Sequence, residues 1–136
     1  MGYMTQSPQL MMHQSALHNV ALPLLIAGYR PQTITKRVRS ALHMVGLEDK
    51  INHLPSQLSC GEQQRLGIAR AIVAKPQLLL ADEPTGNLDP SLSADIFNLF
   101  QKLNRAGVTV LLATHDLSLI GHVDHQVLTL NQGRLL

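Results

Sequence analysis

The feature that most constrains the fold is a short apolar run, residues 77–81, which ends directly in two carboxylates, Asp82 and Glu83. Pro76 bounds this run on one side, and Pro84 follows the carboxylates on the other. A run of this kind suits a strand that is buried on both faces, as in parallel sheets. We therefore expect a parallel sheet in which Asp82 and Glu83 lie at the carboxyl end of one strand.

A second apolar run, residues 108–113, is predicted to be a second buried strand and ends at Thr114 and His115. The segment between the two runs has a helical apolar stripe, so strands and helices alternate and the pattern predicts an α/β fold. In such sheets, ligands gather at the carboxyl ends of the strands. Both polar clusters lie there, and they are the first candidates for a functional site.

Three helices are predicted from capping signals and apolar spacing. Residues 31–45 carry an apolar stripe that ends at a capping glycine, Gly46. Residues 58–74 open with Ser59 and Glu62, the spacing of a capping box. Residues 89–107 begin with Asp89 as the N-cap and a proline at the first helical position.

Two further elements are expected near the end of the chain. Asp116 is a candidate cap for a short helix through Ile120. Residues 127–130 and 134–136 are predicted to form two strands around a tight turn.

Composition excludes several classes of protein. The 136 residues suit one domain, and 45% of them are hydrophobic, which is enough for a core. A net charge of +2 does not support nucleic-acid binding by bulk electrostatics. One cysteine excludes an internal disulfide, and seven scattered histidines with one thiol do not form a structural zinc site.

No membrane span or leader is expected. The most apolar stretch, residues 16–27, is shorter than the roughly 20 apolar residues that cross a bilayer, and His18, Asn19 and Pro23 interrupt it. The start of the chain lacks the basic region of a signal peptide. We expect a cytoplasmic protein that meets a membrane only through a partner.

The polar clusters suggest chemistry on phosphates. An aspartate at a strand tip, such as Asp82, can hold Mg²⁺ beside a nucleotide, and the next carboxylate, Glu83, can orient or deprotonate a water. His115 could donate to a phosphate or to that water. Ser59 and Gly61 open a helix whose free N–H groups favour an anion. Each feature also has an ordinary structural explanation: a solvated acidic turn, a structural histidine or a plain capping box.

Taken in order, these segments resemble the nucleotide-binding subunits of ABC transporters across nearly the whole chain. Residues 58–62 resemble the signature motif and residues 78–83 the Walker B strand. Residues 86–89 resemble the D-loop. Gln6 matches the Q-loop glutamine, and His115 matches the switch histidine. The amino-acid sequence of residues 61–71, 80–89 and 104–110 is most similar to that of the cell-division branch of the family.

The resemblance implies an ABC-type P-loop NTPase fold and ATP hydrolysis with Mg²⁺ in a head-to-tail homodimer. Glu83 and His115 would be catalytic, and Asp82 and Gln6 would hold Mg²⁺. Gln6, Ser59, Gly61, Asp82 and Asp89 would bind nucleotide, Ser59 and Gly61 from the partner subunit. The implied membrane partner is a permease-like subunit of the FtsX type at the cytoplasmic face of the inner membrane. No nucleic-acid partner is implied.

The chain departs from the family pattern in two places. Cys60 stands where the signature motif usually has glycine, at its more permissive position. No Gly-x-x-x-x-Gly-Lys-Ser/Thr motif occurs in the 136 residues. We therefore expect an N-terminally truncated domain that is inactive alone. Residues 7–75 would be its helical subdomain and residues 76–136 the catalytic core.

Three alternatives remain open at this stage. The chain could belong to the lipoprotein-release or the macrolide-export branch, whose members share much of this sequence pattern. It could also be a non-catalytic interaction module, or an inactive product of a damaged gene.

Overall fold

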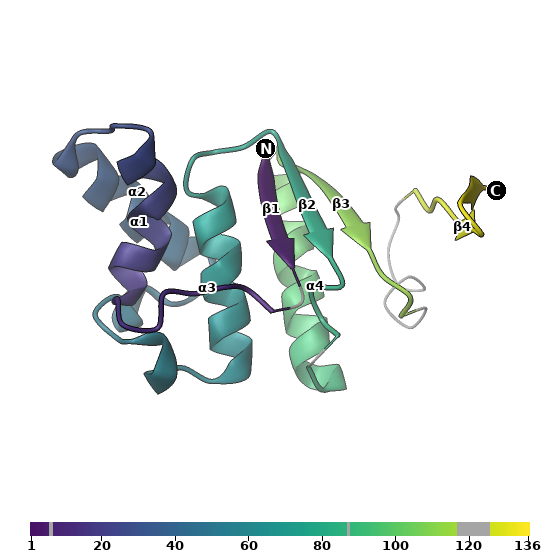
Figure 1. The fold of residues 1–136 in the computed structure, drawn as a ribbon, viewed down its shortest axis with the longest axis horizontal. Coiled ribbons are helices and arrows are strands. Elements are labelled where there is room, and N and C mark those ends of the chain that lie inside the picture. Colours follow the sequence, from purple (N-terminus) through teal and green to yellow (C-terminus); the bar gives the residue numbers. More distant parts are fainter. Residues whose placement is uncertain (6, 87, 117–125) are drawn as a thin grey trace.

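The computed structural model describes residues 1–5, 7–86, 88–116 and 126–136. A parallel sheet lies between α4 on one side and a group of three helices, α1 to α3, beside its β1 edge (Figure 1). The fold class is therefore α/β, as the alternation of strands and helices predicts.

The sheet contains three parallel strands in the order β1-β2-β3. They are β1 (Gly2–Thr5), β2 (Leu78–Asp82) and β3 (Thr109–Ala113). In the register, Thr5 lies opposite Asp82, and Asp82 lies opposite Ala113. The carboxyl ends of all three strands thus meet at one edge, which carries Asp82 and Glu83.

The prediction that both apolar runs are fully buried is wrong. In β2, Leu79 and Ala81 are buried, whereas Leu78 and Leu80 on the opposite face are only partly buried. In β3 the side chains alternate between exposed and half-buried, and Leu111 is 54% exposed. The reason is position: β3 is one of the two outer strands of the described sheet, and α4 packs against it.

Three predicted helices are confirmed with small changes at their ends. They are α2 (Pro31–Met44), α3 (Cys60–Ile72) and α4 (Pro90–Arg105). Gly46 follows α2 with φ of +77°, a conformation that glycine adopts without strain. α3 ends two residues earlier than expected, and two 3₁₀ turns, Glu48–Lys50 and Pro55–Gln57, connect it to α2.

One helix, α1 (Ala16–Ile26), was not expected, because its sequence includes Asn19 and Pro23. Ser15 caps it by accepting a hydrogen bond from the backbone N–H of His18. Asn19 is fully buried, yet its side chain is satisfied by the loop before the helix: it accepts from Met11 N and donates to Met11 O. A buried asparagine with these bonds fixes the loop that leads from β1 into the helical group.

The same loop is held against α3 by a close approach. A Cβ on Gly67 of α3 would lie 2.7 Å from the Cβ of Pro8. The guanidinium of Arg70, one turn further along α3, donates to the carbonyl of Gln9 at 2.8 Å. The path of the chain after β1 is therefore fixed by α3.

The final hairpin is confirmed, but both of its strands are shorter than predicted, and Asn131 belongs to the first strand instead of the turn. It pairs β4 (Leu130–Asn131) with β5 (Arg134–Leu135) in antiparallel register. Gln132 and Gly133 both have positive φ, as a two-residue hairpin turn requires. The short helix expected after Asp116 lies outside the described residues.

Among the residues with described structure, no helix combines the length and hydropathy needed to cross a bilayer.

Candidate nucleotide-hydrolysis site

The side chain of Glu83 is placed by an unusual backbone conformation directly after β2. Its backbone N–H continues the sheet by donating to the carbonyl of Ala113 at 2.8 Å. Its φ is +48°, in the left-handed region that residues with a Cβ seldom adopt. Such strain is retained where the surrounding structure holds it, often at functional sites.

Glu83 makes its contacts with the end of β3. Its Oε1 lies 2.6 Å from His115 Nδ1 and accepts from the backbone N–H of His115 at 3.0 Å. With an ionised carboxylate, which only accepts, Nδ1 is the donor in this contact and Nε2 of the same ring is left for another partner. The two predicted catalytic residues, 32 positions apart in the chain, are therefore in direct contact.

Thr114 completes this network, and no role was predicted for its side chain. Its hydroxyl lies 3.5 Å from Glu83 Oε2 and accepts from the backbone N–H of Asp116 at 3.0 Å. Glu83 is mostly covered, with its side chain 27% exposed, whereas the His115 side chain is 88% exposed. The carboxylate is thus oriented from one side while the imidazole faces outward.

Asp82 lies beside this pair as an exposed carboxylate at the end of β2. The described residues contain no group of three or more acidic, histidine or cysteine side chains that could hold a metal by themselves. Mg²⁺ in nucleotide sites is usually bound by one or two carboxylates, with water and phosphate oxygens as the other ligands. Asp82 fits that mode. Gln6, the second predicted ligand, lies outside the described residues.

The signature segment forms the N-terminus of α3. Ser59 is the N-cap: its hydroxyl accepts from Glu62 N at 3.2 Å, and Glu62 Oε1 accepts from Ser59 N at 2.9 Å. Lys50 forms an ion pair with the other Glu62 oxygen. These bonds lower the pKa of Glu62 from 4.5 to about 2. The hydrogen bond from Lys50 has the largest effect on this pKa, and the bond from Ser59 N has the next largest. The predicted capping box is confirmed.

This pKa shift gives a pH-dependent contribution to stability. The pKa of Glu62 is lower in the folded chain, so its contribution is complete above pH 4.5 and disappears as the pH falls toward 2. Glu62→Gln is expected to lower the free energy of unfolding at pH 7 by about 1 kcal/mol, since Lys50 is partly exposed. Near pH 2 the variant and the parent should be equally stable. Urea unfolding at both pH values measures this.

The matched control is Asp95→Asn, which makes the same change at an exposed carboxylate on α4. It should show no such pH dependence. A loss at Glu62→Gln that is equal at both pH values would contradict the ion-pair explanation.

Gln64 is a site residue that sequence reasoning missed. This buried side chain donates from Nε2 to the carbonyl of Thr5 at 3.2 Å and also to the carbonyl of Pro84. It therefore connects α3 to the end of β1 and to the residue after Glu83. The available signal was a polar side chain on the inward face of a helix that otherwise buries apolar residues.

The remaining predicted site residues have local roles in the structure. Asp89 caps α4 by accepting from Leu92 N at 2.9 Å. Gly61 is buried against the same helix: an added Cβ would lie 3.1 Å from Leu92 Cδ2. Cys60 is exposed, with a free thiol, as the first residue of α3. None of these residues contacts Glu83 or His115 in the described structure, so their nucleotide-binding roles stay predictions.

The comparisons with known proteins identify the family to which this fold belongs. The sequence profile of the family described as "ABC transporter" matches residues 1–86. This chain therefore belongs to the ABC transporter family.

Among the curated proteins similar to this chain are cell-division ATP-binding proteins named FtsE. The Escherichia coli K12 protein is 54% identical over 134 residues, which is 98% of this chain and 60% of that protein. The Haemophilus influenzae protein is also 54% identical, and 62% of it is covered. The Mycobacterium tuberculosis protein is 47% identical over 135 residues. The chain thus spans about 60% of the length of the curated relatives it matches.

A solved structure confirms the fold class. The protein cbiO1 from Clostridium perfringens, described as part of the ABC transporter complex cbiONQ, superposes with a TM-score of 0.82 and 32% identity. The match covers 88% of this chain and 48% of that protein.

Proposed function

We propose that this chain supplies part of the ATP-hydrolysing subunit of an ABC-type complex of the cell-division branch. The observation that carries the proposal is the contact between Glu83 and His115 at the carboxyl edge of the sheet, next to Asp82. The names of the FtsE relatives support the choice of branch. The lipoprotein-release and macrolide-export branches are the competing assignments.

In this proposal Glu83 is the general base. Its carboxylate takes the proton of the water that attacks the terminal phosphate, while His115 holds Oε1 through Nδ1. The outward-facing imidazole leaves Nε2 to donate to, or accept from, groups on the nucleotide side. Mg²⁺, when held by Asp82 and Gln6, would neutralise phosphate charge.

Ser59 and Gly61 would act on a nucleotide held by a second subunit. The capping box uses the Ser59 hydroxyl as an acceptor from Glu62 N, which leaves the hydroxyl proton free to reach a phosphate oxygen. The first N–H groups of α3 point the same way and favour an anion. The proposed assembly is a homodimer that closes head to tail around ATP.

The proposed membrane partner is a permease-like subunit of the FtsX type, bound at the cytoplasmic face of the membrane. The segment between Gln6 and α2 offers it exposed apolar side chains: Met12 is 46%, Leu25 52% and Ile26 78% exposed. Co-purification from detergent with the FtsX subunit of the same organism tests this pairing. Complete absence of the permease would contradict it.

ATP binding and turnover test the function. The 136 residues contain no phosphate-binding Gly-x-x-x-x-Gly-Lys-Ser/Thr motif, so the chain by itself should bind Mg-ATP only weakly, with Kd above about 1 mM. A chimera that joins it to the part of the E. coli relative outside the match should bind with micromolar affinity and hydrolyse ATP. Titration calorimetry and phosphate release measure the two quantities.

Each result has a contrary outcome. Micromolar binding by the chain alone would show that it holds phosphate by a different route. A folded chimera that binds ATP without turnover would favour the alternative of a non-catalytic interaction module.

A further inference from the structure

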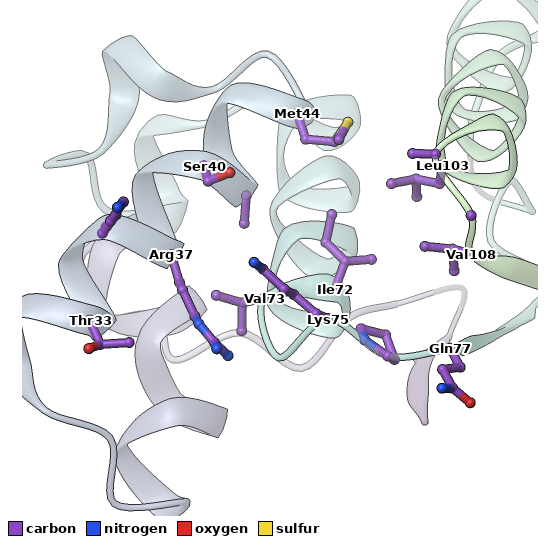
Figure 2. Close-up of a pocket in the computed structure, with 15 residues that line it drawn as sticks. Thr33, Arg37, Ser40, Met44, Ile72, Val73, Lys75, Gln77, Leu103 and Val108 are labelled. Carbon is purple, nitrogen blue, oxygen red and sulfur yellow. The ribbon is translucent and has the colours of Figure 1, made fainter.

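A second site is suggested by a cleft at the end of the sheet opposite Glu83. Its volume is about 750 Å³, and it lies between α2, the link from α3 to β2, and the turn from α4 to β3 (Figure 2). Gln77 and Val108, which line it, directly precede β2 and β3. The cleft is therefore at the amino edge of the sheet, away from the nucleotide site.

One stripe of α2 forms a wall of the cleft. The stripe is made of residues three or four positions apart, so they share one helix face: Thr33, Lys36, Arg37, Ser40, Ala41 and Met44. Across from α2, Ile72, Leu103 and Val108 form an apolar floor that faces the same space (Figure 2). The cleft thus combines an apolar floor with a polar helical wall.

The charged side chains of the cleft are all cationic. Lys36, Arg37 and Lys75 line it, and no aspartate or glutamate does. In the described structure none of the three forms an ion pair; the ion pairs found there join His43, Lys50 and His115 to other carboxylates. A concentration of unpaired positive charge around an apolar floor favours an occupant that is both acidic and apolar.

Two of these cations reach the cleft from different walls. Arg37 stacks over the Tyr29 ring, with its guanidinium carbon 4.7 Å from the ring centroid, while Lys75 extends from the opposite wall toward α2 (Figure 2).

Lys75 is also held in a conformation that lysine seldom adopts. Its φ is +55°, in the left-handed region where glycine is preferred, and its backbone N–H donates to the carbonyl of Ile72. A lysine at this position places a cation over the cleft at some conformational cost. The backbone conformation of Lys75 is thus a second observation at this cleft, beside its positive charge.

We propose that this cleft is a docking site for an acidic segment of a partner protein whose apolar side chains fill the floor. Salt bridges to Lys36, Arg37 and Lys75 would orient the segment, and contacts with Ile72, Leu103 and Val108 would hold it. The site is separate from the nucleotide site and from the exposed side chains proposed to meet the permease. Its occupancy therefore does not depend on the proposed ATPase function.

The test uses the full chain and a short fluorescein-labelled peptide made of glutamate and leucine. Fluorescence anisotropy should show saturable binding that weakens as salt is added. The triple variant Lys36→Glu, Arg37→Glu, Lys75→Glu should bind roughly tenfold more weakly or worse. Ser40→Trp, which fills the cleft and keeps its charge, should also abolish binding.

Matched controls separate the cleft from general charge. Arg39→Glu on α2 and Arg105→Glu on α4 reverse exposed cations that do not line the cleft, and they should retain binding. Circular dichroism checks that each variant is folded. If the triple variant does not fold, Ser40→Trp and the single variant Lys75→Gly, which fits the left-handed backbone, decide the question.

Two results would overturn the proposal. One is equal loss of binding in the controls and in the cleft variants. The other is the absence of peptide binding by the parent chain, while vesicles of phosphatidylglycerol bind it through the same three cations. That outcome would assign the cations to a membrane surface.

Discussion

Glu83→Gln is expected to lower the ATPase turnover of the chimera by about 100-fold or more, because an amide cannot accept the proton of the attacking water. The change is nearly isosteric, and an amide oxygen can still accept from His115 N. ATP affinity should therefore be retained, and ATP-bound dimer should accumulate. Phosphate release measures turnover, and size-exclusion chromatography with ATP measures the dimer.

The control for this prediction is Asp95→Asn, an acid-to-amide change on α4 at an exposed position. Its turnover should equal that of the parent chimera. A Glu83→Gln chimera with near-parental turnover would exclude Glu83 as the base.

His115→Ala is expected to lower turnover by about tenfold or more while leaving ATP affinity within a few-fold of the parent. The substitution removes the 2.6 Å contact from Nδ1 to Glu83, but it keeps the backbone N–H that also donates to Oε1. Glu83 thus loses part of its orientation, and the effect should be smaller than that of Glu83→Gln. Steady-state kinetics separate turnover from KM.

A double variant shows whether the two residues act as a unit. If His115 works through Glu83, the double variant should be no slower than Glu83→Gln alone, because the effects of coupled residues do not add. Fully multiplicative losses would instead mean that His115 contacts the nucleotide independently. His43→Ala, at an exposed histidine paired with Glu48, is the neutral control.

The parts of the fold that follow local rules were predictable from the sequence. α3 and α4 begin at residues whose side chains cap them, and α2 carries one apolar stripe. The parallel sheet was also predictable, because a helix between two strands provides the crossover that parallel strands need. These signals lie within a few residues of the element that they specify.

The parts that depend on distant contacts were not predictable. α1 is apolar nearly all round and contains a buried Asn19, and only the loop at Met11 explains how that amide is satisfied. The exposure of Leu111 depends on β3 being an edge strand, which its own residues do not reveal.

The candidate site, like the fold, was predictable only in part. The positions of Asp82, Glu83 and His115 at neighbouring strand ends could be inferred from the two apolar runs. Three other features of the site could not be inferred, because they depend on segments that are far apart in the chain. They are the left-handed backbone at Glu83, the hydroxyl contact from Thr114 and the link through Gln64. The types of residue at the site are therefore predictable, whereas the orientation of their side chains depends on tertiary contacts.

The outer edge of β3 has one more consequence. Within the described residues this edge is not paired with another strand, so its backbone N–H and C=O groups can template a further one. Because carboxyl ends of parallel strands share one edge, a strand added in parallel would end beside His115. Phosphate-binding loops directly follow a strand, so such a strand would deliver its loop to Glu83. A strand added in antiparallel direction would bring its opposite end to this position, and its loop would lie far from Glu83.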